Sequence, residues 1–166
     1  GSTHGGDEKR FRRHSRNSPH CRGGDGDYEN LPRCEHYCKI GYLTELEREI
    51  MSIKRINSNS RMSQVVIHGG IIYTAGIVAA DPNTDIQGQT GQILDTIDQY
   101  LLSNESNKSN IISATIWLAD MADFSEMNAI WDMWLAKDNP PVRACVEAKL
   151  AAPQYKVEIQ ITAVQA

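Results

Sequence analysis

From residue 51 onward, short apolar runs alternate with turn-forming residues at regular intervals. Runs of β-branched and aliphatic residues bounded by Gly, Pro, Asn or Ser are typical of strands. This pattern predicts strands at 52–56, 64–68, 71–75, 111–118, 142–148 and 156–164. Gly69 and Gly70 separate the second and third of these runs, and two glycines supply the positive φ values that a tight hairpin needs. The third strand leads into a loop at 79–85 that contains Pro82 and Asn83.

Two segments have the spacing of amphipathic helices. In the first, at 86–104, the apolar residues form one stripe: Ile93, Leu94, Ile97, Tyr100 and Leu101. The second follows Asp123 and Glu126, whose spacing predicts a capping box. It places its apolar residues at helical spacing: Met127, Ile130, Trp131, Trp134 and Leu135. We interpret the two tryptophans as core or interface packing, and Pro140-Pro141 ends the segment.

The last strand alternates with a period of two, which puts its aliphatic residues on one face and Glu158, Gln160 and Thr162 on the other. The order β-β-β-α-β-α-β-β predicts an α+β sandwich, in which a mixed sheet carries two helices on one face. The other face is left for something else to cover, and we expect a partner subunit there.

Residues 1–50 differ in composition from the rest of the chain. They are rich in Gly, Ser, Asn, Arg and Asp, and such a segment buries too little apolar surface to offset the entropy of ordering. We interpret them as a poorly ordered leader, derived from cloning or from upstream sequence, ahead of a domain at 51–166. An alternative is a zinc knuckle built from Cys21, Cys34, His36 and Cys38. Its second ligand pair would have to be His20 with Cys21, and adjacent ligands fit zinc poorly.

Charge and hydropathy narrow the class of protein. The chain carries a formal net charge of −4, all of it on 51–166, because residues 1–50 hold equal numbers of basic and acidic side chains. An acidic domain without a basic face repels phosphates, which disfavours nucleic acid as a partner. No apolar run reaches the ~20 residues of a membrane span, and the first residues lack a secretory apolar region. We therefore expect a cytoplasmic protein that does not contact membranes.

Taken alone, the residues of the domain suggest little chemistry. It contains one histidine, His68, which we interpret as a turn residue, and one cysteine, Cys145, which we interpret as a small buried side chain. No metal-ligand cluster or phosphate-binding loop is present in its sequence. Arg143 follows a rigid Pro-Pro entry and Glu158 lies within an alternating strand, on the face opposite its aliphatic row, yet both positions also suit ordinary surface residues.

Three stretches resemble one known family. NPPVRACVEAKLAAPQYKVEIQITAV (139–164) is similar to the signature of the RidA (YjgF) family of imine and enamine deaminases, in which Arg-x-Cys-Val-Glu precedes a strand with an internal glutamate. YTAGIVAADPNTD (73–85) resembles the family's segment before its first helix, and ADFSEMNAIW (122–131) resembles the start of its second helix. The resemblance extends over essentially all of 51–166.

The resemblance implies a chorismate-mutase-like subunit in a homotrimer, with a barrel-like core of sheets and a cleft between each pair of subunits. It implies that Arg143 binds the carboxylate of a small-molecule substrate and that Glu158 holds a water near the imine carbon. The backbone near Cys145 and Gly76 would add polar contacts, and Asn128 would lie near the site or be structural. The implied reaction is the hydrolysis of 2-imino or 2-enamino acids to 2-oxo acids and ammonia, without a metal or other cofactor.

Two positions depart from the family pattern. Met62 stands where the members best known for 2-aminoacrylate carry tyrosine, and Ala75 replaces a common serine. The resemblance implies that both residues contribute to substrate binding, so these changes leave carboxylate recognition to Arg143 but put side-chain preference in doubt. The alternatives are a divergent deaminase of another imine or enamine, a sensor that binds 2-oxo acids without turnover, and, less favoured, an endoribonuclease.

Overall fold

The structure is a computed structural model that describes residues 51–166. Its strands are β1 (Lys54–Ser58), β2 (Ser63–His68), β3 (Ile71–Thr74), β4 (Ile111–Leu118), β5 (Val142–Glu147) and β6 (Val157–Val164). Its helices are α2 (Ile86–Leu102) and α3 (Phe124–Trp134), and two short 3₁₀ segments are η1 (Lys108–Asn110) and η2 (Met121–Asp123).

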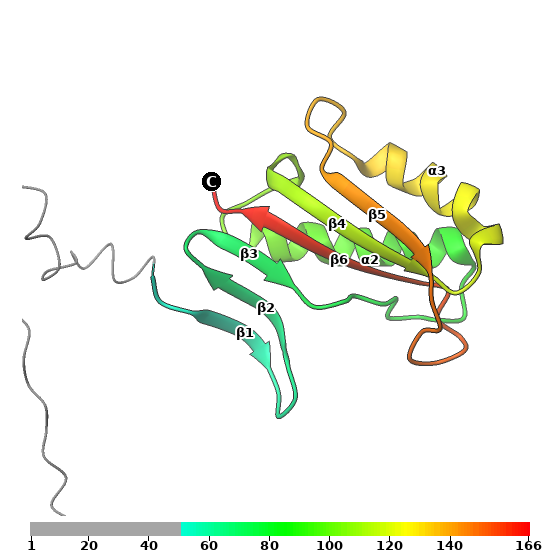
Figure 1. Cartoon of the computed structure of the whole chain (residues 1–166), viewed down its shortest axis with the longest axis horizontal. Helices are drawn as coiled ribbons and strands as arrows, with labels where there is room; N and C mark the ends of the chain where they lie inside the picture. The colour runs from blue at the N-terminus through cyan, green and yellow to red at the C-terminus, as the bar shows by residue number, and fades with distance from the viewer. Residues whose placement is uncertain (1–50) are drawn as a thin grey trace, which may run out of the picture. The chain divides into compact units, whose positions relative to one another are not determined.

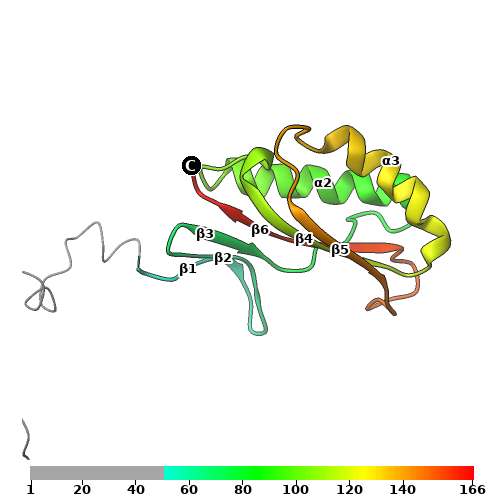
Figure 2. The same ribbon diagram turned by 45° about the horizontal axis from the view of Figure 1, so that its top comes forward.

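The strands form one sheet in the order β1-β2-β3-β6-β4-β5. All neighbours are antiparallel except β4 and β5, which are parallel because α3 lies in the connection between them. Figures 1 and 2 show α2 and α3 together on one face of the sheet, with β5 as the edge strand beside α3. The predicted α+β fold, a mixed sheet with two helices on one face, is confirmed.

The predicted apolar rows form the core. On β6, the alternate residues from Val157 to Ala163 are at most 1% exposed, and the α2 stripe of Ile93, Leu94, Ile97 and Leu101 is at most 2% exposed. On the opposite face of the sheet, apolar side chains remain in the open: Tyr73 is 46% exposed, Val142 73% and Val146 48%. These side chains are left largely uncovered within residues 51–166, and the prediction that a partner subunit covers this face stays a prediction.

The turn predictions had different outcomes. Gly69 and Gly70 have φ values of 60° and 73°, as a two-residue hairpin of the mirror-image type requires. The predicted capping box at Asp123 is wrong, because the Asp123 side chain makes no cap hydrogen bond and has helical backbone angles. The side-chain cap belongs instead to Asp120, which accepts from the backbone N–H of Ala122 at 2.8 Å and begins η2. The Asp123 carboxylate lies 3.7 Å from Lys156 Nζ.

A buried glutamine fixes the start of β6. Gln89 on α2 is 0% exposed, and its side-chain nitrogen donates to the carbonyl oxygens of Pro82, Thr84 and Gln154 at 2.9–3.2 Å. Its Oε1 accepts from the backbone N–H of Lys156 at 2.9 Å. This one side chain therefore ties the loop before α2 to the residue that precedes β6, the strand that carries Glu158.

None of the helices within residues 51–166 is long and apolar enough to cross a membrane.

Candidate active site

Arg143 lies on the edge strand, on the face of the sheet that carries the helices. Its Cα is paired with that of Ala114, whose side chain is buried in the core on that face. The Arg143 side chain is exposed, and its Nη1 donates to Asn128 Oδ1 at 2.7 Å. Its Cζ lies over the ring of Trp131, 5.4 Å from the centroid. Asn128 and Trp131 are three residues apart on α3, so the same face of that helix presents both to the guanidinium.

Trp131, whose ring lies against the Arg143 guanidinium, is itself held in place by its neighbours. Trp131 is 3% exposed, and its ring lies 5.3 Å from that of Trp134 at an angle of 54°. Trp134 Nε1 donates to Asp98 Oδ2 on α2 at 2.9 Å. The two tryptophans pack as the sequence predicts, but the sequence pattern did not predict the contact of Trp131 with Arg143. The i, i+3 spacing of Asn128 and Trp131 was the available signal.

Glu158 lies on the open face. Its Cα is paired with that of Trp117 on β4, whereas the neighbouring residues Val157 and Ile159 are fully buried on the helix side. The carboxylate packs directly against Gly76, where a β-carbon would come within 2.8 Å of the Glu158 Cδ. Backbone hydrogen bonds in both directions between Ile77 and Ile159, at 2.8 and 3.0 Å, hold this segment in place. Gly76 is therefore the residue that leaves room for the glutamate.

Within one chain, the structure does not bring Arg143 and Glu158 together. Their partners on β4, Ala114 and Trp117, are three residues apart, and β4 separates β5 from β6. Three residues of about 3.3 Å and two strand spacings of about 4.8 Å put the two Cα atoms about 14 Å apart, with the side chains on opposite faces. The convergence of these two groups in one cavity between subunits stays a prediction, and it requires two copies of the chain.

The remaining predicted residues lie in three places. Cys145 is two residues beyond Arg143 on the same face of β5 and packs at the edge of the core. Partial burial raises the pKa of its thiol, and the nearby Arg143 charge offsets part of that rise. Ala75 donates its N–H to the Gln64 carbonyl at 2.8 Å, next to Gly76. Met62 is 43% exposed at the turn between β1 and β2, where Asn59 Oδ1 accepts from its backbone N–H.

The other predictions concern His68 and a metal site. His68 is exposed at the end of β2, directly before the glycine turn, in agreement with its interpretation as a turn residue. In the part of the chain that the structure describes, no three His, Cys, Asp or Glu side chains are placed to hold a metal ion. The zinc hypothesis for Cys21, Cys34, His36 and Cys38 lies outside the described residues.

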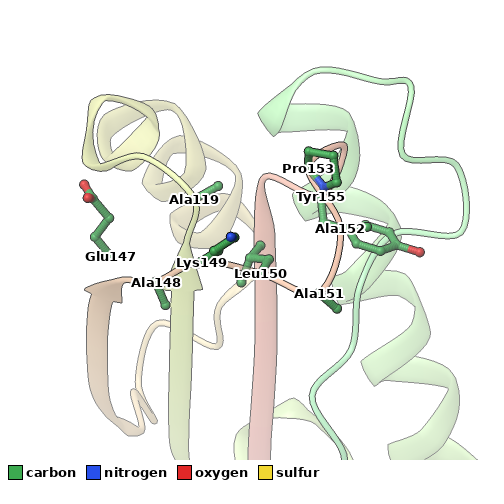
Figure 3. A pocket seen from close by; sticks show the side chains of 9 residues that line it. All are labelled: Ala119, Glu147, Ala148, Lys149, Leu150, Ala151, Ala152, Pro153 and Tyr155. Carbon is green, nitrogen blue, oxygen red and sulfur yellow. The ribbon is translucent and has the colours of Figure 1, made fainter.

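A pocket of about 510 Å³ lies elsewhere, against the loop between β5 and β6 (Figure 3). Its lining includes Glu147, Lys149, Leu150 and Tyr155, together with several alanines, and none of the predicted site residues. Glu147 already accepts a hydrogen bond from the backbone N–H of Met121 at 3.1 Å. The pocket therefore lies apart from the residues on which the predicted chemistry depends.

Comparison with known proteins identifies the family and the fold of the chain. The Endoribonuclease L-PSP family profile matches residues 52–165. A RutC family protein of Haemophilus ducreyi is 50% identical over 111 residues, which cover 67% of this chain and 95% of that protein. The RutC family protein YoaB of Escherichia coli K12 is 46% identical over 113 residues, covering 68% of this chain and 98% of YoaB.

Solved structures agree with the sequence comparison. The crystal structure of NMB1025, a member of the YjgF protein family from Neisseria meningitidis, has a TM-score of 0.68 and 41% identity, and the match covers 70% of this chain and 98% of that one. A protein from Salmonella typhimurium described as a putative translation initiation inhibitor has a TM-score of 0.64 and 43% identity. The chain belongs to the RutC/YjgF family, which is also called the L-PSP family, and the predicted family resemblance is confirmed.

Proposed function

We propose that the protein hydrolyses 2-imino and 2-enamino acids to 2-oxo acids and ammonia. The proposal depends on the exposed and uncompensated positive charge of Arg143. Its guanidinium is exposed and held in place, and among residues 51–166 no carboxylate lies within ion-pair distance of it. An arginine that keeps its full charge and a free edge is suited to bind a small carboxylate.

The reaction follows from this anchor and from a second group. An enamine acid tautomerises to its imine, whose carbon is the electrophile. The Glu158 carboxylate takes one proton from a water molecule while the water oxygen bonds to that carbon, and Glu158 passes this proton to the nitrogen as the C=N double bond becomes a single bond. In the resulting carbinolamine, Glu158 takes the hydroxyl proton and gives it to the nitrogen. The C–N bond then breaks, ammonia leaves, and the C–O bond becomes the carbonyl of the 2-oxo acid. These steps need no metal or organic cofactor.

The proposed site is formed by two subunits. Since Arg143 and Glu158 face opposite sides of one sheet, the substrate would bind to Arg143 of one subunit and meet Glu158 of its neighbour. The exposed apolar side chains around Val142 and Val146 lie on the same open face as Glu158, and they supply the surface for such an assembly. The homotrimer implied by the family resemblance would provide three equivalent sites. Holding the carboxylate and the water together makes the attack effectively intramolecular.

The test uses an amino-acid oxidase to generate an imino acid in the presence of semicarbazide, which traps the imine that remains. We expect the protein to lower semicarbazone formation, Arg143→Ala to abolish this effect, and Glu158→Gln to slow it by about 10²- to 10⁴-fold. The matched controls are Lys137→Ala and Glu126→Gln, which change exposed charges elsewhere and should leave the rate unchanged.

Other outcomes would point to other functions. Saturable binding of 2-oxo acids without turnover would contradict the enzyme and favour a sensor. RNA cleavage that survives Arg143→Ala would favour the nuclease activity in the name of the family profile. The charge of 51–166 argues against the latter, because its twelve acidic and eight basic residues repel a phosphate backbone.

A further inference from the structure

The side chain that accepts a hydrogen bond from Arg143 is neutral. A carboxylate in the place of Asn128 would hold the guanidinium equally well, but it would also cancel its charge. The Asn128 amide oxygen accepts the Nη1 hydrogen bond at 2.7 Å and leaves the positive charge intact. Trp131 acts in the same way, because an aromatic face attracts a cation without neutralising it.

The geometry also identifies which edge of the guanidinium is free. Of the five N–H groups of an arginine, the structure gives a hydrogen bond within residues 51–166 only to Nη1. Nε and Nη2 form the other edge, whose two parallel N–H bonds match the two oxygens of a planar carboxylate. The contact with Trp131 fixes the position of Cζ, and the bond to Asn128 fixes the rotation of the group.

We propose that Asn128 and Trp131 are positioning residues, which hold Arg143 so that its Nε–Nη2 edge receives the carboxylate of the substrate. This inference rests on the proposed function, since it explains how the anchor of that reaction is prepared. In this inference Asn128 acts on the substrate only through Arg143 and does not contact the substrate. The gain is entropic, because a side chain that is already ordered loses less freedom when the ligand binds.

The first measurement needs no substrate. In the full-length protein, ¹⁵N relaxation of the Arg143 Nε–H group reports the order of the side chain, and its signal is assigned by its loss in Arg143→Lys. In the wild-type protein we expect an order parameter S² near about 0.85, the value typical of ordered backbone. In Asn128→Ala the order parameter should fall below about 0.6. Ser125→Ala, an exposed change on the same helix, should leave it unaltered.

The second measurement separates position from charge, with 2-oxobutanoate as the probe ligand in calorimetry. Asn128→Ala should weaken its binding by about 2- to 12-fold, the cost of ordering one long side chain. Asn128→Asp should keep Arg143 rigid and yet weaken the binding of 2-oxobutanoate, because the new carboxylate competes with the ligand for the guanidinium. In the deaminase assay, Asn128→Ala should raise KM more than it lowers kcat, and Trp131→Phe should retain most of both.

The inference is overturned if the Arg143 Nε–H group is already flexible in the wild-type protein, or equally ordered in Asn128→Ala. It is also overturned if Asn128→Asp binds 2-oxobutanoate as tightly as the wild type. A rigid Arg143 that loosens in Asn128→Ala, in a protein that does not hydrolyse imines, would leave the positioning role standing and refute only the proposed reaction.

Discussion

Mixing two inactive variants tests whether the proposed site spans two subunits. Arg143→Ala removes the anchor from one face of the sheet and Glu158→Gln removes the base from the other. The two Cα atoms lie about 14 Å apart in one chain, and the sheet itself lies between the side chains. In a closed ring of subunits, however, a subunit with an intact Arg143 can face a neighbour with an intact Glu158.

The expected recovery of activity follows from the fraction of sites that hold both an intact Arg143 and an intact Glu158. When the two variants are mixed in equal amounts and their subunits assemble at random, half of the anchors and half of the bases are intact. One site in about four then holds both. Because purification through both tags removes the trimers made of a single variant, about one site in three is intact in the purified trimers, which should recover about a third of the wild-type rate. Sites contained within a single chain would recover nothing, because every chain lacks one of the two groups.

The assay co-expresses the two variants with different affinity tags, purifies the mixed oligomers through both tags in turn, and measures imine hydrolysis. Native mass spectrometry gives the subunit ratio. The matched control mixes Arg143→Ala with the double variant Arg143→Ala/Glu158→Gln, which has no intact anchor and should stay inactive. Mixed oligomers no more active than the separate variants would refute a site built by two subunits.

Three further predictions follow from the described contacts. Gln89→Leu should lower the free energy of unfolding by about 2–4 kcal/mol in chemical denaturation, because it removes four hydrogen bonds from a fully buried position. The control Gln87→Leu, at an exposed position of the same helix, should change the free energy of unfolding by less than about 0.5 kcal/mol. Gly76→Ala should displace the flexible Glu158 side chain, so that kcat falls while the melting temperature changes little; an unchanged kcat would exclude Glu158 from the rate-limiting step. Because burial raises the pKa of the Cys145 thiol above its ordinary value, its alkylation by iodoacetamide, followed by peptide mass spectrometry, should be slow at neutral pH and should keep accelerating through the alkaline range; a plateau near pH 7 would contradict this.

The fold could be predicted because each element carries its own periodicity. The alternation of β6, the α2 stripe and the Gly69-Gly70 turn are local signals, and all three are found in the structure. The ends of elements were less certain: β1 begins two residues later than predicted, and α2 ends at Leu102. The error at Asp123 has a physical cause, because a 3₁₀ turn precedes α3 and moves the capping position back to Asp120.

The site was harder to predict because its contacts join distant parts of the sequence. The four hydrogen bonds of Gln89 link α2 to carbonyl and N–H groups up to 67 residues away, and no periodicity marks such a residue. The face on which Arg143 lies depends on the register of β5 against β4, which a strand of six mostly exposed residues does not reveal by itself. The resemblance identified Arg143 and Glu158, whereas only the register showed that they face opposite sides.

This register also explains why the pocket of Figure 3 and the proposed chemistry lie in different places. The pocket is a hollow of one chain, formed where the β5–β6 loop folds over the end of the sheet. A site divided between two subunits leaves only half on each: an exposed guanidinium on an edge strand, and a carboxylate on an open sheet face. Neither half holds both groups, so the site that binds the substrate would form only when the exposed face around Val146 is covered by a neighbour. In such a protein, assembly and activity are expected to be lost together, although each chain keeps its fold.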